Sequence, residues 1–312
     1  MSVLPTLRNV RAAHRRLRAR IHRTPLVSSA TLSSRAGVDL LFKCENLQKS
    51  GSFKYRGAMN AVLSLTSAQR RLGVVTHSSG NHGAALASVA QSLGIAATIV
   101  VPRNASVFKR AAIRRYGGTI VYSGTTLKAR EKTLAILAAN TGAHYIPPYD
   151  HPAVIAGQAT ASVEIVEDCP CVDEVWLPVG GGGLAAGAVV AIGESVQVVG
   201  AEPELAKDAF MSLQCGERQA AYPPRTVADG LRASLGVLNF RLLQDYALPV
   251  KLVTEAEILA AQMLTMSCLK LLVEPSSAVP VAALLKYGPV HKATGRVVII
   301  VTGGNVEVQQ SL

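Results

Sequence analysis

The distribution of hydrophobic and polar residues divides the chain into short apolar runs and longer stretches with helical spacing. Val74–Thr76, Ala96–Val101 and Thr119–Tyr122 have the length of strands, and Phe108–Tyr116 and Leu127–Asn140 have the spacing of helices. Further strand-like runs lie near Val175, Val196 and Val297. Strands that alternate with helices in this way predict βαβ units and an α/β fold with parallel sheets.

The length of the chain predicts two domains. Its 312 residues exceed what one hydrophobic core usually supports. Residues 73–149 form a compact run of alternating strands and helices, which predicts a small domain, and residues 1–72 and 150–312 then form a discontinuous large domain. Hydrophobic residues make up 49% of the chain and aromatic residues only 4%, which suits helices packed on a buried parallel sheet.

The basic N-terminal segment admits three interpretations. The formal net charge is +12, and seven arginines lie between Arg8 and Arg23. Such a segment is compatible with nucleic-acid binding or with an organelle transit peptide. Apolar residues recur within it at spacings of three and four, however, which favours an amphipathic helix with its arginines in water. The inner face of that helix is predicted to contain Leu7, Val10, His14, Leu17 and Ile21.

Other features predict a cytoplasmic protein that binds neither membranes nor nucleic acids. No apolar stretch approaches the ~20 residues needed to cross a bilayer, and the N-terminus lacks the apolar core of a secretory signal. The five cysteines are scattered and odd in number, which is typical of reduced thiols in a cytosolic protein. They are Cys44, Cys169, Cys171, Cys215 and Cys268.

One lysine has the surroundings of a nucleophile. Lys54 lies between Phe53 and Tyr55 in the segment Ser52–Gly57 (SFKYRG). Aromatic neighbours can partly desolvate the amine and lower its pKa, so that it can add to a carbonyl and form a Schiff base. This lysine is therefore the first candidate for a catalytic residue.

A run of four glycines is the second candidate. Gly180–Gly183 follows a strand-like stretch and precedes a helix-prone one, so its backbone amides can surround a phosphate. The same segment also permits a dinucleotide interpretation, because Gly181, Gly183 and Ala186 have the G-x-G-x-x-G/A spacing and Glu202 follows about twenty residues later. An NAD-dependent oxidoreductase is thus an alternative, but it leaves SFKYRG unexplained.

Together with further motifs in the same order, these segments resemble the fold-type II pyridoxal-phosphate enzymes, in the branch of serine/threonine dehydratases and serine racemase. The additional motifs are Arg23–Leu26 (RTPL), Ser78–Gly83 (SSGNHG), Ala228–Gly230 (ADG), Glu274–Ser276 (EPS) and Thr302–Asn305 (TGGN). The resemblance implies a tryptophan synthase beta-like fold: two open, twisted, mostly parallel sheets with helices on both faces. It also implies pyridoxal 5'-phosphate as cofactor and a homodimer.

The resemblance assigns roles to individual residues. Lys54 matches the family's Schiff-base lysine, which also removes the Cα proton of the substrate. Asn81 matches the residue beside the ring hydroxyl oxygen, Phe53 the ring-stacking position and Thr302 the hydroxyl against the ring nitrogen. The phosphate site is matched by Gly180, Gly181, Gly182, Gly183 and Leu184. The substrate carboxylate is assigned to Ser78, Ser79, Asn81 and His82.

Two further assignments distinguish the racemase group. Ser79 matches the serine that faces the catalytic lysine across the cofactor and acts as a second acid/base. Glu202, the Ala206 carbonyl and Asp208 match a divalent-cation site, and hard oxygen ligands of this kind suit Mg²⁺ or Ca²⁺.

These assignments predict an ammonia-lyase that converts a small β-hydroxy amino acid, such as serine, threonine, hydroxyaspartate or phenylserine, to a 2-oxo acid and ammonia. Thr302 supports elimination, because a hydroxyl at the ring nitrogen does not stabilise a protonated ring as a carboxylate does. Racemisation of serine or aspartate, with Ser79 as the second acid/base, is the main alternative. Since the chain ends soon after Thr302–Asn305, no C-terminal regulatory domain is expected.

Overall fold

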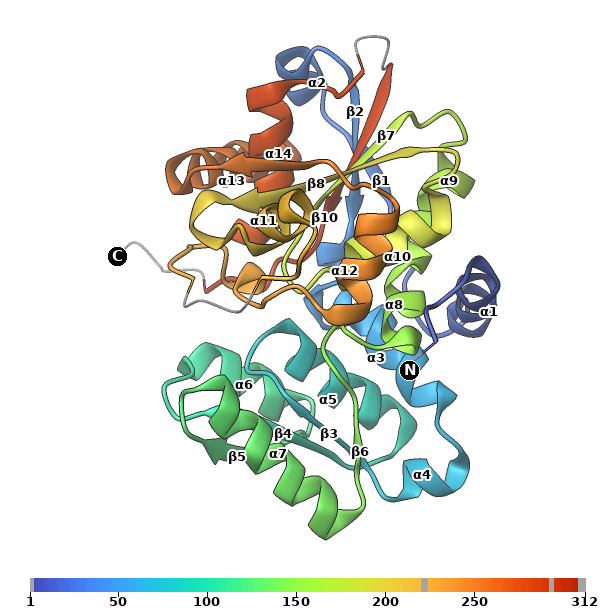
Figure 1. Cartoon of the computed structure of the whole chain (residues 1–312), viewed down its shortest axis with the longest axis vertical. Coiled ribbons are helices and arrows are strands. Elements are labelled where there is room, and N and C mark those ends of the chain that lie inside the picture. The colour runs from blue at the N-terminus through green and yellow to red at the C-terminus, as the bar shows by residue number, and fades with distance from the viewer. Residues whose placement is uncertain (1–2, 220–223, 292–294, 308–312) are drawn as a thin grey trace.

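Two open β-sheets with helices on both faces make up the protein in the computed structural model, which describes residues 3–219, 224–291 and 295–307 (Figure 1). The strands of the larger sheet are, in spatial order, β1 (Leu26–Ser28), β2 (Asp39–Cys44), β10 (Arg296–Val301), β7 (Glu174–Pro178), β8 (Gln197–Pro203) and β9 (Val250–Val253). Those of the smaller sheet are β5 (Thr119–Ser123), β4 (Ala97–Pro102), β3 (Val74–His77) and β6 (His144–Tyr145). All pairs except β1–β2 are parallel, which confirms the predicted fold class.

The helices that cover the sheets follow most strands directly. They are α1 (Leu7–Leu17), α2 (Ala30–Ala36), α3 (Lys54–Ser64), α4 (Ser67–Arg71), α5 (Asn81–Leu93), α6 (Val107–Arg115), α7 (Leu127–Thr141), α8 (Pro152–Gln158), α9 (Thr160–Asp168), α10 (Gly183–Ile192), α11 (Asp208–Cys215), α12 (Val237–Asp245), α13 (Glu255–Leu269) and α14 (Pro275–Tyr287). In the described parts of the chain, every helix is too short or too polar to span a bilayer.

The alternation of side chains along β10 explains how the large sheet is buried on both faces. Val297, Ile299 and Val301 belong to a cluster that includes apolar residues of α13 and α14. Val298 and Ile300 point the other way and pack with residues of α9 and α10. A strand buried on both faces needs a continuous apolar run, which is why β10 was readily predicted from sequence.

The small sheet is enclosed by helices in the same way. Val74, Ile99 and Val101 pack with apolar residues of α3 and α5, whereas Val75 and Val100 pack against α7. In Figure 1 this sheet and α4 to α7 form the lower lobe, and the large sheet lies in the upper lobe. Helix α3 contacts both α5 of the lower lobe and α8, which covers the large sheet. The proposed domain division at residues 73 and 149 stays a prediction.

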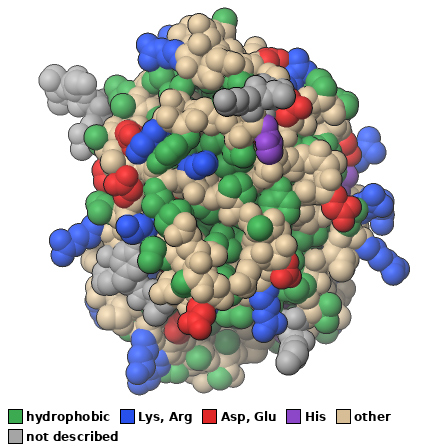
Figure 2. All heavy atoms as spheres, turned by 45° about the horizontal axis from the view of Figure 1, so that its top comes forward, with side chains coloured by type: hydrophobic (Ala, Val, Ile, Leu, Met, Phe, Trp, Pro, Cys, Tyr) green, Lys and Arg blue, Asp and Glu red, His purple; other side chains and the backbone are tan. Residues whose placement is uncertain are grey.

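The N-terminal helix α1 agrees only in part with the predicted amphipathic face. Val10, Ala13 and Leu17 are buried, and the arginines of this helix are exposed. The prediction was wrong for Leu7, which is 37% exposed because it lies in the first turn, and α1 ends before Ile21. On the face drawn in Figure 2, Lys and Arg side chains lie both at the outline and within the face, where some are next to hydrophobic side chains.

The parallel strands bring distant parts of the sequence to one edge of the large sheet. The glycine run follows β7, Thr302 follows β10, and Glu202 lies near the end of β8. In open α/β sheets ligands bind outside the carboxyl ends of the strands. The fold therefore gathers the predicted site residues where a ligand site is expected.

Candidate active site

Lys54 is the first residue of α3. The residue is half-buried, and its side chain points inward so that the amine contacts other residues. The amine donates a hydrogen bond to the Pro148 carbonyl (3.0 Å), and it lies 5.0 Å from the ring centroid of Phe53 and 5.9 Å from that of Tyr149. Burial lowers the pKa of Lys54 to about 8, although the nearby carboxylate of Glu274 acts in the opposite direction. Near neutral pH a useful fraction of this amine is therefore uncharged and nucleophilic.

A buried ion-pair network holds the start of α3 in place. The Arg56 guanidinium, two residues after Lys54, donates to both carboxylate oxygens of Glu45 and both of Glu164, at 2.7 to 2.8 Å. Arg56 is fully buried, and Lys43 adds a further ion pair to Glu164. Removal of one partner from such a network leaves an uncompensated buried charge, so Lys54 begins a helix with little freedom to move.

The glycine run forms a cradle that a side chain would fill. A Cβ atom at Gly181 would lie 2.4 Å from Cγ of Tyr149, and Gly182 has φ +86°, a conformation that favours glycine. The first N–H groups of α10, which begins at Gly183, have no partner within the helix. These amides and the helix dipole suit a phosphate dianion, and Leu184 is buried behind them.

A second helix N-terminus, in the small-sheet region, lies near Lys54. Helix α5 begins at Asn81, after the turn of Ser78 and Ser79, and its N-cap residue provides no side-chain hydrogen bond. The His82 ring lies 3.0 Å from the Ile146 carbonyl, and burial, with a smaller effect of Lys54, lowers the pKa of His82 to about 3. Backbone N–H groups, and not a charged imidazole, are thus available here for a carboxylate.

The Asn81 side chain is held by two partners from other parts of the sequence. Its Nδ2 lies 3.0 and 2.9 Å from the two carboxylate oxygens of Glu274, and its Oδ1 accepts a hydrogen bond from Asn305 (2.8 Å). Sequence analysis assigned no role to Glu274. Burial raises the pKa of Glu274 to about 7, while the Asn81 amide acts in the opposite direction.

Thr302 lies directly after β10 and is 2% exposed. Its Oγ1 is 2.9 Å from Oγ of Ser277, a residue that sequence analysis did not select, and Ser277 also donates to the Gly303 carbonyl. The Phe53 amide donates to the Thr302 carbonyl (3.0 Å). This bond places the predicted stacking residue and the predicted ring-nitrogen contact next to each other.

An ion pair between the two lobes lies beside these residues. Lys109 near the start of α6 pairs with Asp229, which begins a short 3₁₀ helix (Asp229–Leu231) of the large-sheet region. Both charges are near enough to influence the pKa of Glu274, in opposite directions. The pair therefore connects the lobes close to the predicted site.

Glu202 and Asp208 form a pair of neighbouring carboxylates. The amides of Ala209 and Phe210 donate to Glu202, and the Leu235 amide donates to Asp208. Burial, and then the nearby Asp208, raise the pKa of Glu202 well above its usual value. In the described ranges no three His, Cys, Asp or Glu side chains cluster as a metal site, so these two carboxylates and the Ala206 carbonyl remain a proposed ligand set.

A divalent cation is expected to stabilise the protein through this pair, because it offsets the cost of two buried carboxylates. At about 100 times its dissociation constant, Ca²⁺ or Mg²⁺ should add ~2.7 kcal/mol to the free energy of unfolding. Thermal unfolding with the cation and with EDTA measures this effect. Asp208→Asn should remove it and the exposed control Glu204→Gln should keep it; equal melting temperatures with cation and EDTA in the unmodified protein would contradict the assignment.

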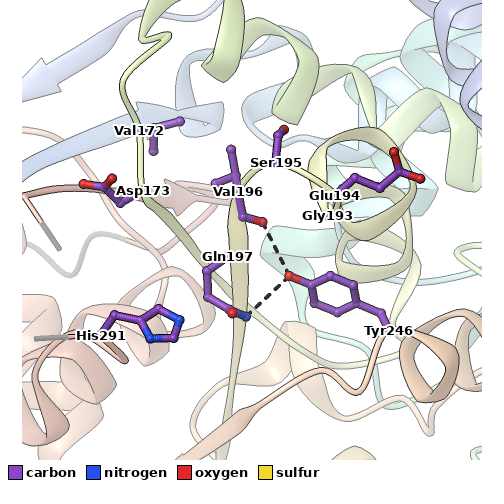
Figure 3. Close-up of a pocket in the computed structure, with 9 residues that line it drawn as sticks. All are labelled: Val172, Asp173, Gly193, Glu194, Ser195, Val196, Gln197, Tyr246 and His291. Atoms are coloured by element: carbon purple, nitrogen blue, oxygen red, sulfur yellow. Dashed lines mark hydrogen bonds between the residues drawn. The ribbon is translucent and has the colours of Figure 1, made fainter. Parts of the chain in front are cut away.

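A separate pocket of about 430 Å³ lies away from these residues (Figure 3). Val172 and Asp173 precede β7, and Glu194 to Gln197 lead into β8, so the pocket is at the amino ends of the strands. The Tyr246 hydroxyl accepts from Gln197 (3.4 Å) and also lies 3.4 Å from the Val196 carbonyl. None of the predicted site residues lines this pocket, which is at the opposite edge of the sheet.

Comparison with known proteins identifies the class. The model of the family described as pyridoxal-phosphate dependent enzyme matches residues 17–303, and the chain belongs to this family. Its structural neighbours have fold type II. This membership replaces the dinucleotide interpretation of the glycine run and makes pyridoxal phosphate the cofactor.

Individual proteins are similar to this chain over nearly its whole length. The chain is 42% identical to a beta-hydroxyaspartate dehydratase of Paracoccus denitrificans, over 98% of both chains. It is also 42% identical to a serine racemase of Dictyostelium discoideum, over 97% of this chain and 95% of the relative. The crystal structure of a threonine deaminase from T.th. superposes with a TM-score of 0.92 at 39% identity, over 98% of this chain and 100% of that one.

The residues of the predicted site fit this cofactor chemically. The Lys54 amine suits its carbonyl, the glycine cradle with the α10 N-terminus suits its phosphate, and the buried Thr302 hydroxyl suits its ring nitrogen. Tyr149 was missed by sequence reasoning, although its ring contacts the cradle and lies near Lys54. Its only sequence signal is an aromatic residue in a proline-containing loop, which is not specific.

Proposed function

We propose that the protein is a pyridoxal-phosphate-dependent ammonia-lyase, a dehydratase, that converts a small β-hydroxy amino acid to a 2-oxo acid and ammonia. The observation that carries this proposal is the placement of the Lys54 amine, with its lowered pKa, among the rings of Phe53 and Tyr149 beside the glycine cradle. Relatives named as dehydratase and threonine deaminase support it. A cytoplasmic homodimer stays a prediction.

Each part of the site has a separate role in the proposed elimination. The N-terminus of α5 would bind the substrate carboxylate through the backbone amides near Asn81 and His82. Lys54 would remove the Cα proton, and the β-hydroxyl would take up one proton and leave as water, so that this step neither gains nor loses protons overall. The enamine that remains would tautomerise to an imine, which water would hydrolyse to the 2-oxo acid and ammonia. When bound, the cofactor delocalises the electron pair left at Cα. The Thr302 hydroxyl, held by Ser277, would offer the ring nitrogen no negative charge, and this would favour prompt loss of the β-substituent.

The charge of the small lobe favours an acidic substrate. Residues 73–149 contain eight Lys or Arg and only one Asp or Glu, namely Glu131. This positive field extends toward the predicted carboxylate-binding turn, because Arg130, after burial, contributes to lowering the pKa of His77, the residue before Ser78. We therefore place 3-hydroxyaspartate, which carries a second carboxylate, ahead of serine and threonine as substrate.

A substrate panel tests this function. Purified holoenzyme is mixed with the stereoisomers of 3-hydroxyaspartate, serine, threonine and phenylserine, and 2-oxo acid, ammonia and chiral composition are followed together. The expected result is ammonia release with the largest kcat/KM for 3-hydroxyaspartate, falling more steeply with salt than that for serine. Absence of 2-oxo acid from every substrate would overturn the proposal.

Racemisation is the second candidate, supported by the identity to serine racemase and by Ser79. Ser79 lies half-buried in the turn before α5. If its hydroxyl acts as acid/base on the face opposite Lys54, Ser79→Ala is expected to lower inversion at Cα by ~10² or more, because general acid-base catalysis contributes about that much. Elimination from the isomer that Lys54 deprotonates should fall far less. Chiral chromatography of serine or aspartate measures the inversion; equal losses of both reactions would contradict this role.

A further inference from the structure

Glu274 is a buried carboxylate to which neither the proposed elimination nor sequence analysis gives a task. It precedes α14, is 4% exposed, and its amide donates to the Gly303 carbonyl (3.0 Å). A Cβ atom at Gly303 would lie 2.8 Å from the Glu274 carboxylate, and one at Gly230 would lie 3.7 Å from it. The backbone at Gly303 and Gly230 thus lies close to this side chain, whose carboxylate faces Asn81.

The hydrogen bonds of Asn81 give its carboxamide one orientation. Oδ1 accepts from Asn305, whose Nδ2 also donates to the Ser50 carbonyl (2.9 Å). Nδ2 faces both oxygens of Glu274, which can only accept while the carboxyl group is ionised. Rotating the amide by half a turn would place Oδ1 against the carboxylate and Nδ2 against the Nδ2 of Asn305, so two bonds would become repulsive contacts.

The amide nitrogen of Asn81 carries two hydrogens, and the two oxygens of the Glu274 carboxylate, at 3.0 and 2.9 Å, can share a single N–H between them. We propose that Glu274 is a positioning residue that fixes the Asn81 carboxamide, so that the second N–H of Asn81 stays available as a donor to the ring oxygen of the cofactor. This inference rests on the proposed placement of the cofactor beside Asn81. Without Glu274 the Asn81 carboxamide can rotate and place its Oδ1 against the ring oxygen of the cofactor. Both atoms are then hydrogen-bond acceptors, and they repel each other.

The charges around Glu274 are consistent with this task. The positive charges of Lys54 and Lys109 favour the ionised form of Glu274, and the negative charge of Asp229 disfavours it. Burial raises the pKa of Glu274, so the ionised form lowers the stability of the cofactor-free fold, and that penalty develops as the pH rises from about 4.5 through about 7. A residue kept only for stability would therefore be better replaced by glutamine.

A double-mutant cycle on cofactor affinity tests the inference. The full-length chain, freed of cofactor, is titrated with pyridoxal phosphate, and the absorption spectrum of the bound cofactor is recorded across pH. Glu274→Gln should raise the dissociation constant about 10-fold and alter the pH dependence of the spectrum. Asn81→Ala should raise the constant at least as much, and adding Glu274→Gln to it should change nothing further. Glu274→Gln should unfold at pH 8 at the same temperature as the unmodified protein or higher.

The control is Glu174→Gln, which alters a buried carboxylate at the opposite edge of the sheet, bonded to the Trp176 indole, and should leave cofactor affinity unchanged. Additive effects of the Glu274 and Asn81 substitutions would show that Glu274 does not act through Asn81 and would overturn the inference. A large loss of stability in Glu274→Gln would equally overturn it in favour of a structural role. Failure of the proposed function differs from both outcomes, because the unmodified protein would then bind cofactor without releasing ammonia from any substrate.

Discussion

Replacement of Lys54 by alanine is expected to lower kcat/KM for ammonia release by at least ~10⁴, since it removes both the covalent attachment of the cofactor and the base that takes the Cα proton. Among the described residues, the Lys54 amine alone lies over the Phe53 ring. Borohydride reduction of the holoenzyme followed by peptide mass spectrometry should find the cofactor on the peptide that contains Lys54, and on none in the variant.

The pH dependence of attachment is an independent measure of the same residue. Because burial lowers the pKa of Lys54 to about 8, the rate at which cofactor-free protein reacts with pyridoxal phosphate should rise with pH and level off above about 8, not above 10. Lys251→Ala is the matched control, since Lys251 is half-buried and its amine also lies over an aromatic ring, that of Tyr287. Retention of colour and activity in Lys54→Ala would refute the assignment.

Substitution of Gly181 by alanine is expected to raise the dissociation constant of the cofactor by ~10² or more. The new Cβ would overlap the Tyr149 ring at 2.4 to 2.6 Å, so the loop or the ring must shift, and the phosphate would lose some of the backbone amides that surround it. Titration of cofactor-free protein with pyridoxal phosphate measures the affinity, and circular dichroism verifies that the variant is folded.

Gly295→Ala serves as the control for this substitution. Among the described residues, a Cβ at Gly295 would meet Asp173 alone, at an ordinary 3.6 Å, at the other edge of the sheet. Its affinity for the cofactor should equal that of the unmodified protein. Unchanged affinity in Gly181→Ala would mean that the phosphate binds elsewhere, and the cradle at the end of β7 would lose its proposed role.

Strands β3, β4, β7, β8 and β10 could be predicted because they are largely buried. Runs such as Val297–Val301 contain no polar residue, and their length and β-branched composition mark them. The short edge strand β6, with two residues, and the antiparallel β1, with three, have no such signal. Leu7 was misplaced for a related reason: the first turn of a helix extends past the surface against which the helix packs.

The site residues that could be predicted from the sequence are those whose chemistry depends on residues next to them in the chain. Lys54 and the glycine run could be predicted because the neighbouring residues define their chemistry. Glu274 and Ser277 were missed because their partners, Asn81 and Thr302, lie 193 and 25 positions away, and only the closed fold brings them together. Tyr149 was missed in the same way, since its contact with the glycine cradle depends on the path of the chain between the lobes.

The position of β10 within the large sheet has a consequence for synthesis on the ribosome. This strand lies between β2 and β7 and pairs with both, yet it follows every other strand of the sheet in the sequence. Until residue 301 has emerged, β2 and β7 each lack a neighbour, and their open edges can pair with other chains. A nascent polypeptide of this protein is therefore expected to expose these two strand edges to other chains until β10 has been made.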